Sequence, residues 1–190
     1  YTTINKSTDH FNTKLYTGNS GTQAITGVGF KPDWVWIKDR DESSSHELFD
    51  AIRGVTKTIN SNSTAVEATQ ADSLTAFGAD GFTVGSNGDI NYSGSDIIAW
   101  NWKGSGSSAV SNSNGSYTSS VIANDTAGFS IVKYTGGSGA GTVGHGLSAA
   151  PELILLKPYD YADNWRVYHR QIDADAADYF LKLQSTAART

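Results

Sequence analysis

The sequence predicts an all-β protein built as an antiparallel β-sandwich, and three observations support this. The 190 residues include 20 Gly and many Ser, Thr and Asn, a composition that favours turns. Charged residues make up only 17 %, without the long charged runs of surface helices. Aromatic residues make up 11 %, enough apolar area for a packed core and too much for a disordered chain.

Two parts of the chain resemble each other, at 17–38 (TGNSGTQAITGVGFKPDWVWIK) and 135–157 (TGGSGAGTVGHGLSAAPELILLK). Each follows a Tyr, contains a Gly-x-Gly-apolar turn and places a Pro-acid pair before an apolar strand. The strand reads WVWIK in the first copy and LILLK in the second. A self-similarity of this kind indicates a repeated structural unit.

The strand at 34–37 is the strongest in the chain, because it consists of aromatic and β-branched residues. Alternate residues of a strand point to opposite faces, so Trp34 and Trp36 share one face and Val35 and Ile37 the other. Both faces are therefore expected to be buried, as in a sandwich. We expect the remaining strands of the first copy at 11–16, 23–30, 46–50, 57–59, 74–77, 81–84 and 96–102. Polar loops are expected at 39–45 and 60–73, and Asn-Gly and Ser-Gly turn signals fill 85–95.

The domain organisation follows from the repeat. Residues 1–103 form a first β-sandwich module, and 104–116 (GSGSSAVSNSNGS) are a Gly/Ser/Asn linker by composition. Residues 117–190 form a second module, a truncated copy of the first. It has counterparts of the strands up to 57–59 but none of 74–102.

An incomplete copy would have open sheet edges and an uncovered apolar face. We therefore expect the polypeptide to continue past Thr190, or a neighbouring subunit to supply the missing strands.

Charge and composition bear on the classes of partner. The formal charge is −5 without a basic cluster, which argues against a nucleic-acid partner. No apolar run approaches the 18 residues of a membrane span, so no membrane partner is predicted. Cysteine is absent, which excludes disulfides and thiolate metal sites.

No motif predicts catalysis, so we expect no enzyme activity and no catalytic residue. The four histidines show no metal-ligand spacing, and no GxSxG nucleophile motif occurs. A hydrolase would require His46 or His169 beside an acid and a nucleophile. Acidic residues at 39–42, Asp80, Asp89 and Asp96 could supply oxygen ligands to Ca²⁺, but they lack EF-hand spacing and suit solvated turns. We therefore predict no metal and no cofactor, with calcium as the less favoured alternative.

The aromatic residues fall into two groups. Trp34, Trp36, Trp100 and Trp102 lie in predicted strands and are expected to pack in the core. Aromatic residues in loops are better placed to stack on sugars. The candidate glycan contacts are Tyr92, Tyr159, Tyr161 and Trp165.

An ordered series of motifs resembles a repeated module in virion proteins of tailed bacteriophages, notably marine and cyanobacterial ones. In the first copy the motifs are GFKPDWVWIK at 29–38, HELFDAIRG at 46–54, NSTA at 62–65, DGFTVG at 80–85 and AWNWK at 99–103. In the second copy they are VGHGL at 143–147, AP at 150–151 and NWRVYH at 164–169.

The resemblance implies a concanavalin/laminin-G-like jelly roll in a tail fibre, spike or head-decoration appendage, located in the virion and without catalytic residues. We expect a homo-oligomer that assembles with other virion proteins and contacts host-surface glycans. The alternative is a carbohydrate-binding, lectin-like module of a secreted bacterial protein.

Overall fold

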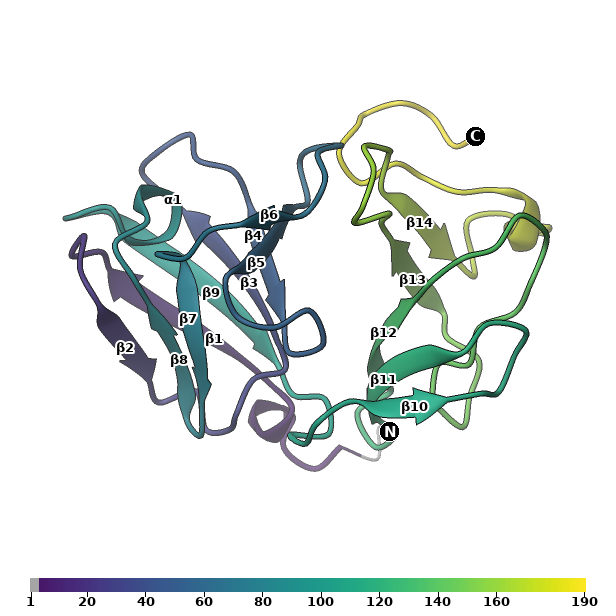
Figure 1. Cartoon of the computed structure of the whole chain (residues 1–190), viewed down its shortest axis with the longest axis horizontal. Coiled ribbons are helices and arrows are strands. Elements are labelled where there is room, and N and C mark those ends of the chain that lie inside the picture. Colours follow the sequence, from purple (N-terminus) through teal and green to yellow (C-terminus); the bar gives the residue numbers. More distant parts are fainter. Residues whose placement is uncertain (1–3) are drawn as a thin grey trace.

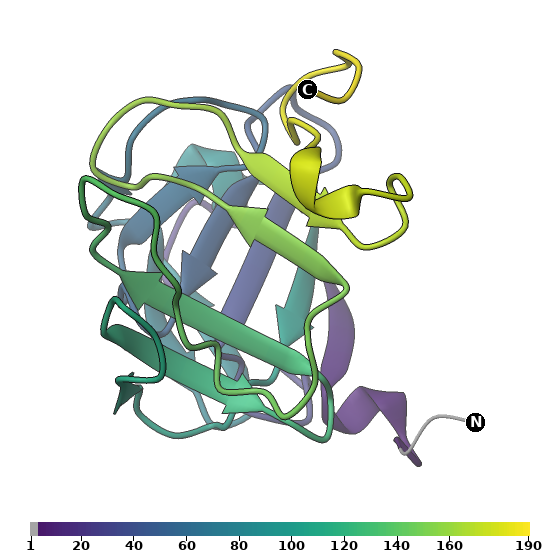
Figure 2. The ribbon, with the colours of Figure 1, turned by 90° about the vertical axis from the view of Figure 1, so that its right-hand side faces the viewer.

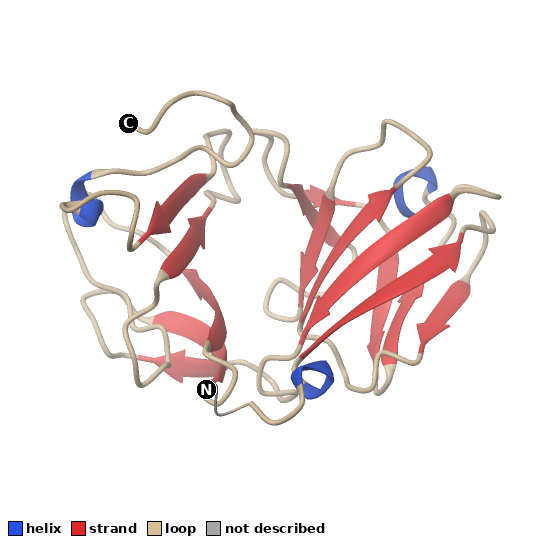
Figure 3. Cartoon of the chain, turned by 180° about the vertical axis from the view of Figure 1, so that it is seen from behind, coloured by secondary structure: helices blue, strands red, loops and turns tan. Residues whose placement is uncertain are grey.

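The computed structural model describes residues 4–190, so the first three residues of the predicted first module lie outside the described residues. The chain is built from antiparallel β-strands with very little helix (Figure 3). The predicted all-β antiparallel sandwich is confirmed.

The helical elements are η1 (Ser7–Asp9), α1 (Gly88–Asn91) and η2 (Ala176–Asp178). The strands are β1 (Phe11–Thr17), β2 (Gln23–Thr26), β3 (Trp34–Asp39), β4 (Glu47–Asp50), β5 (Lys57–Asn60), β6 (Ala68–Thr69), β7 (Leu74–Gly78), β8 (Gly81–Val84), β9 (Asp96–Trp102), β10 (Val110–Asn112), β11 (Ser119–Asn124), β12 (Phe129–Tyr134), β13 (Leu153–Leu156) and β14 (Arg166–His169).

The first copy is a complete sandwich of two sheets. Its six-stranded sheet has the order β1-β9-β3-β4-β5-β6, and its three-stranded sheet has the order β2-β8-β7. Apolar side chains from both sheets and from α1 form the core between them. These are Ile25, Val35, Ile37, Phe49, Leu74, Phe82, Val84, Ile90, Ile97 and Ala99.

The second copy forms the opposite side of the molecule, as the sheets β10-β11-β12 and β13-β14. Figure 1 shows these strands facing the outer surface of the six-stranded sheet. The ring of Phe129 stacks on Trp34 at 5.8 Å and on Trp102 at 6.4 Å between centroids. Leu48, Ile59 and Trp165 form a buried cluster with Trp34, Trp36, Leu155 and Leu183 around it. The predicted burial of β3 is confirmed for Val35 and Ile37, whereas Trp34 and Trp36 are half-buried on the outer face of the sheet, where the second copy packs on them.

Several segments differ from their sequence predictions. The strand predicted at 23–30 ends at Thr26, and the loop predicted at 60–73 contains β6. Residues 104–116, predicted as a linker, contain β10, in which Val110 lies opposite Val121. Residues 110–112 form a strand because their main chain pairs with β11. Hydrogen bonds between main chains do not depend on the identity of the side chains, so a Ser- and Asn-rich segment can form them. The turn region 85–95 contains α1, which begins where the Asn87 side chain accepts a hydrogen bond from the amide of Asp89 at 2.9 Å. Burial of Ile90 against the core stabilises this short helix.

Gly81→Ala is expected to lower the free energy of unfolding by roughly 2–3 kcal/mol. Gly81 has φ +144°, and an added Cβ would lie 2.0 Å from the carbonyl oxygen of Ile25 in the paired strand. Gly54→Ala is the matched control, because φ is +94° there and an added Cβ has open space. It should cost only about 1 kcal/mol. Urea unfolding followed by tryptophan fluorescence measures both, and equal costs would contradict the close contact of β2 and β8.

Candidate functional site

The four predicted glycan contacts come from two parts of the chain, Tyr92 from the first copy and the other three from the segment between β13 and β14. Tyr92 directly follows α1 in the first copy and is 54 % exposed, and Tyr161 in the loop after β13 is 58 % exposed. Tyr159 is half-buried, with the Nζ of Lys133 4.9 Å from its ring centroid. In the part of the chain described, no ring contact joins Tyr92 to Tyr159 or Tyr161. The four residues do not form one aromatic platform.

The prediction that Trp165 contacts a sugar is wrong, because its side chain is only 4 % exposed. The indole packs with Leu48 and Ile59 of the first copy, and its Nε1 donates a hydrogen bond to the carbonyl oxygen of Asn60 at 2.8 Å. Its place after the polar loop 160–164 predicted exposure. The packing of one copy on the other buries it instead.

The histidines accept or share hydrogen bonds with groups that are not catalytic partners. The Nδ1 of His46 accepts from the Nε1 of Trp36 at 2.9 Å, and burial together with the nearby Lys38 lowers the pKa of His46, which favours the neutral acceptor. The Nδ1 of His169 accepts from the amide of Gln171 at 3.2 Å. Within residues 4–190, neither ring hydrogen-bonds to a carboxylate or a hydroxyl.

The acidic side chains of the loops accept hydrogen bonds from backbone amides, in their own loop for Asp39 and in a distant turn for Asp80. The carboxylate of Asp80 accepts from the amides of Gly27 at 2.9 Å and Gly29 at 2.6 Å, and these bonds lower its pKa. The Oδ1 of Asp39 accepts from the amides of Asp41 and Glu42. Among the described residues, no three His, Cys, Asp or Glu side chains are arranged to hold a metal ion.

Two buried carboxyls were not singled out from the sequence. Asp33 is fully buried, and its Oδ2 accepts from the amide of Gly106 at 2.8 Å, which holds the segment after β9 against the start of β3. Burial raises the pKa of Asp33, and the amide hydrogen bonds offset this in part. The repeated Pro-acid pair at 32–33 was the available signal, and it marks a structural position.

The second carboxyl, Glu47, lies within the six-stranded sheet. Its carboxylate accepts hydrogen bonds from the Oγ1 of Thr58 and, at 2.6 Å, from the Nδ2 of Asn60. Burial raises the pKa of Glu47, and these hydrogen bonds offset the shift in part.

Glu47→Gln is expected to remove a pH dependence of stability. Because the folded pKa lies above the ordinary value of 4.5, the folded protein holds this proton more tightly than the unfolded chain. The protonated carboxyl of Glu47 therefore stabilises the folded protein fully below pH 4.5, and this contribution is lost as the pH rises through the folded pKa. The unfolding free energy of the variant relative to the parent should therefore increase from about pH 4 to about pH 8. Glu42→Gln, at an exposed loop position, is the control. The same trend in both variants would contradict the role of burial.

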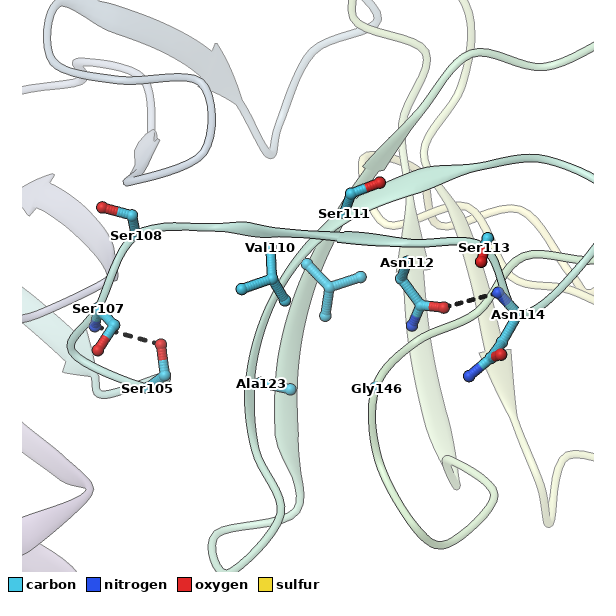
Figure 4. A pocket seen from close by; sticks show the side chains of 11 residues that line it. Ser105, Ser107, Ser108, Val110, Ser111, Asn112, Ser113, Asn114, Ala123 and Gly146 are labelled. Atoms are coloured by element: carbon cyan, nitrogen blue, oxygen red, sulfur yellow. Dashed lines mark hydrogen bonds between the residues drawn. The ribbon is translucent and has the colours of Figure 1, made fainter.

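Two shallow polar hollows lie on the second copy. The first, of about 430 Å³, is lined by Ser, Asn, Val, Ala and Gly and by no ionisable side chain (Figure 4). The second, of about 600 Å³, includes Asp125 and His145 in its lining. Asp125 accepts hydrogen bonds from the amide and hydroxyl of Ser148, at 2.7 and 2.8 Å, which lower its pKa. Asp125, His145 and Ser148 line the second hollow together, and the Nδ1 of His145 accepts a hydrogen bond from the amide of Leu147 at 3.2 Å.

Within the described residues, exposed aliphatic side chains and unpaired strand edges occur together in the second copy. Large aliphatic side chains are exposed on or next to its strands, and strand edges lie beside them. These side chains are Val110, Leu153, Leu156 and Leu181. Exposed apolar groups beside open sheet edges are typical of surfaces that other proteins cover.

A family model matches residues 6–190 of the chain. The chain belongs to the family described as Domain of unknown function (DUF7483). The matched range of this DUF7483 chain includes both copies and the segment between them. No curated protein and no solved structure matches the chain. In residues 4–190, no helix has the length and apolar character needed to cross a membrane.

Proposed function

We propose that this chain is a structural protein of a tailed-bacteriophage virion, in a tail fibre, spike or head-decoration appendage, and that it acts by protein–protein assembly. The observation that carries the proposal is the unpaired strand edges of the second copy together with its exposed aliphatic side chains, which suit burial against protein. The ordered motifs that resemble phage virion modules support the location and the jelly-roll form of the sandwich.

The proposed partners are further copies of the chain and other virion proteins, because appendages are commonly symmetric assemblies. Attachment to the host surface is a second role of the same appendage. The net charge of −5 supports a surface that does not bind nucleic acid.

Labelling of phage particles tests the virion location. Antibodies raised against the purified chain are applied to particles of a phage that encodes it, and the gold label is located by electron microscopy. We expect label on tail or head appendages and the chain among the particle proteins in mass spectrometry. Its presence in the infected-cell lysate together with its absence from purified particles would overturn the proposal.

The exposure of Tyr92 and Tyr161 favours carbohydrate binding as the second candidate. On a glycan array, Tyr92→Ala or Tyr161→Ala would then abolish binding. Leu15→Ala, at an exposed aliphatic position, is the matched control and should leave binding unchanged. A chain that binds no glycan but is present in virions would support the structural role alone.

A further inference from the structure

The strand pairing of the first copy recurs in the second residue by residue. In each copy a central strand pairs with the next strand along the chain, which in turn pairs with a third segment. The pairing of β3 with β4 corresponds to the pairing of β13 with β14. Equivalent positions in these two pairs differ by 119 residues, which aligns WVWIK with LILLK. The equivalent pairs are Trp36–Leu48 with Leu155–Val167, and Leu48–Ile59 with Val167–Leu181.

Within residues 4–190, the second copy contains no counterpart of one strand of this arrangement. In the first copy β9 lies between β1 and β3 and pairs with both. The equivalents of β1 and β3 are β12 and β13, which belong to separate sheets. In Figure 2 the green strands of the sheet that contains β12 lie apart from the yellow-green strands of the sheet that contains β13. In the described chain, β11 is the ladder partner of β12 and β14 that of β13, so each has one edge without a partner strand.

The register of β9 identifies the residues beside this space. Trp100 of β9 lies opposite Thr13 of β1 and Trp36 of β3. The equivalents of Thr13 and Trp36 are Ile131 and Leu155, so a strand in the space would have apolar neighbours on both sides.

An occupant of the space would extend an interface that already exists. Leu155 and, through strand alternation, Ile131 point toward the tryptophan face of the six-stranded sheet. Phe129 of β12 already stacks on that face, against Trp34. A strand between β12 and β13 would therefore gain main-chain hydrogen bonds and cover the same aromatic layer.

Charge defines one position of the missing strand. Ile98 of β9 lies between Leu15 and Lys38, whose equivalents are Lys133 and Lys157. The Nζ of Lys157 donates to the carbonyl oxygens of Thr64 and Pro158, and Lys133 lies over Tyr159. Within residues 4–190, neither lysine forms an ion pair. An acidic side chain at this position would have a lysine on each side.

We propose that the space between β12 and β13 binds one extended segment of a partner polypeptide. The segment runs antiparallel to both strands, is apolar at alternate positions and carries an acidic residue between Lys133 and Lys157. Binding of this kind adds a strand to open sheet edges, where main-chain hydrogen bonds give affinity and side chains give specificity. The proposal holds whether or not the chain is a virion protein.

The test uses two synthetic peptides with the sequence of residues 95–103, one with Ile98→Glu and one with Ile98→Lys, and isothermal titration calorimetry of the whole chain. We expect the Glu peptide to bind about fivefold more tightly or better, because two opposite-charge cross-strand pairs replace two like-charge pairs. The protein variant Lys133→Glu should abolish or reverse this preference. Lys6→Glu, at an exposed position outside the second copy, should leave the preference unchanged.

Three results would overturn the proposal. The first is that neither peptide binds at concentrations on the order of 1 mM, the weakest affinity that a specific site would show. The second is that the Lys133→Glu variant prefers the Glu peptide over the Lys peptide as strongly as the parent protein does. The third is self-association of the chain that excludes both peptides, since a second copy would then occupy the space in place of a separate partner.

Discussion

Trp165→Ala is expected to lower the free energy of unfolding by about 3–5 kcal/mol. The indole is 4 % exposed and fills the contact between the two copies, beside Leu48 and Ile59. Its removal leaves a cavity there and deprives the carbonyl oxygen of Asn60 of the hydrogen bond from the indole nitrogen. Because both copies meet at this side chain, the loss should also weaken the packing of β13 and β14 on the tryptophan face.

Urea unfolding followed by far-ultraviolet circular dichroism measures the effect of Trp165→Ala. Tyr161→Ala, at an exposed aromatic position in the preceding loop, is the control and should change stability by about 0.5 kcal/mol or less. Trp165→Phe keeps much of the apolar area but lacks the donor, so its cost should lie between the two. Equal stability of Trp165→Ala and Tyr161→Ala would show that the copies do not pack through this residue.

Arg53→Ala is expected to cost about 3–5 kcal/mol, because it leaves a buried carboxylate without its cation. The side chain of Arg53 is 6 % exposed and that of its partner Asp50 is 10 % exposed. The guanidinium also donates to Glu67 at 3.4 Å and to the carbonyl oxygen of Leu48 at 3.0 Å. The network joins β4, the turn after it and the segment before β6.

The control for Arg53→Ala is Arg170→Ala, which removes an ion pair with Glu152 whose two side chains are each 67 % exposed. An exposed pair of this kind should contribute about 0–1 kcal/mol. A double variant, Arg53→Ala with Asp50→Asn, should cost less than the sum of its single changes, because the unpaired charge is removed. If Arg53→Ala lowered the free energy of unfolding no more than Arg170→Ala does, the result would contradict a buried network around Arg53.

Most strands of the first copy could be predicted from the sequence, because their apolar residues alternate and glycines or asparagines separate them. The prediction failed where tertiary contacts decide the local structure. β10 is a Val-Ser-Asn segment whose composition suits a linker, and its pairing with β11 makes it a strand. The helix α1 follows from one capping residue, Asn87, and from burial of Ile90, neither of which produces a repeating pattern.

The candidate site could be predicted only in part, because exposure depends on how the copies pack. Tyr92 and Tyr161 are exposed, as expected of loop residues, but Trp165 is buried by a surface more than 100 positions away in the chain. The replacement of Trp34 and Trp36 by leucines in the second copy correctly indicated that these tryptophans pack. The repeat also indicated that residues 117–190 contain no counterparts of the strands at 74–102. The edges of β12 and β13 that have no partner strand in the described chain could be identified only from the observed pairing.

Amide hydrogen exchange, followed residue by residue in the isolated chain, tests most directly whether the second copy has one open strand position. We expect the amides of β9 to exchange slowly, because this strand is paired on both edges and lies in the centre of its sheet. The amides of β12 and β13 that do not face β11 or β14 should exchange much faster than the equivalent amides of β1 and β3. Equally slow exchange at both sets of amides would contradict an open position between β12 and β13.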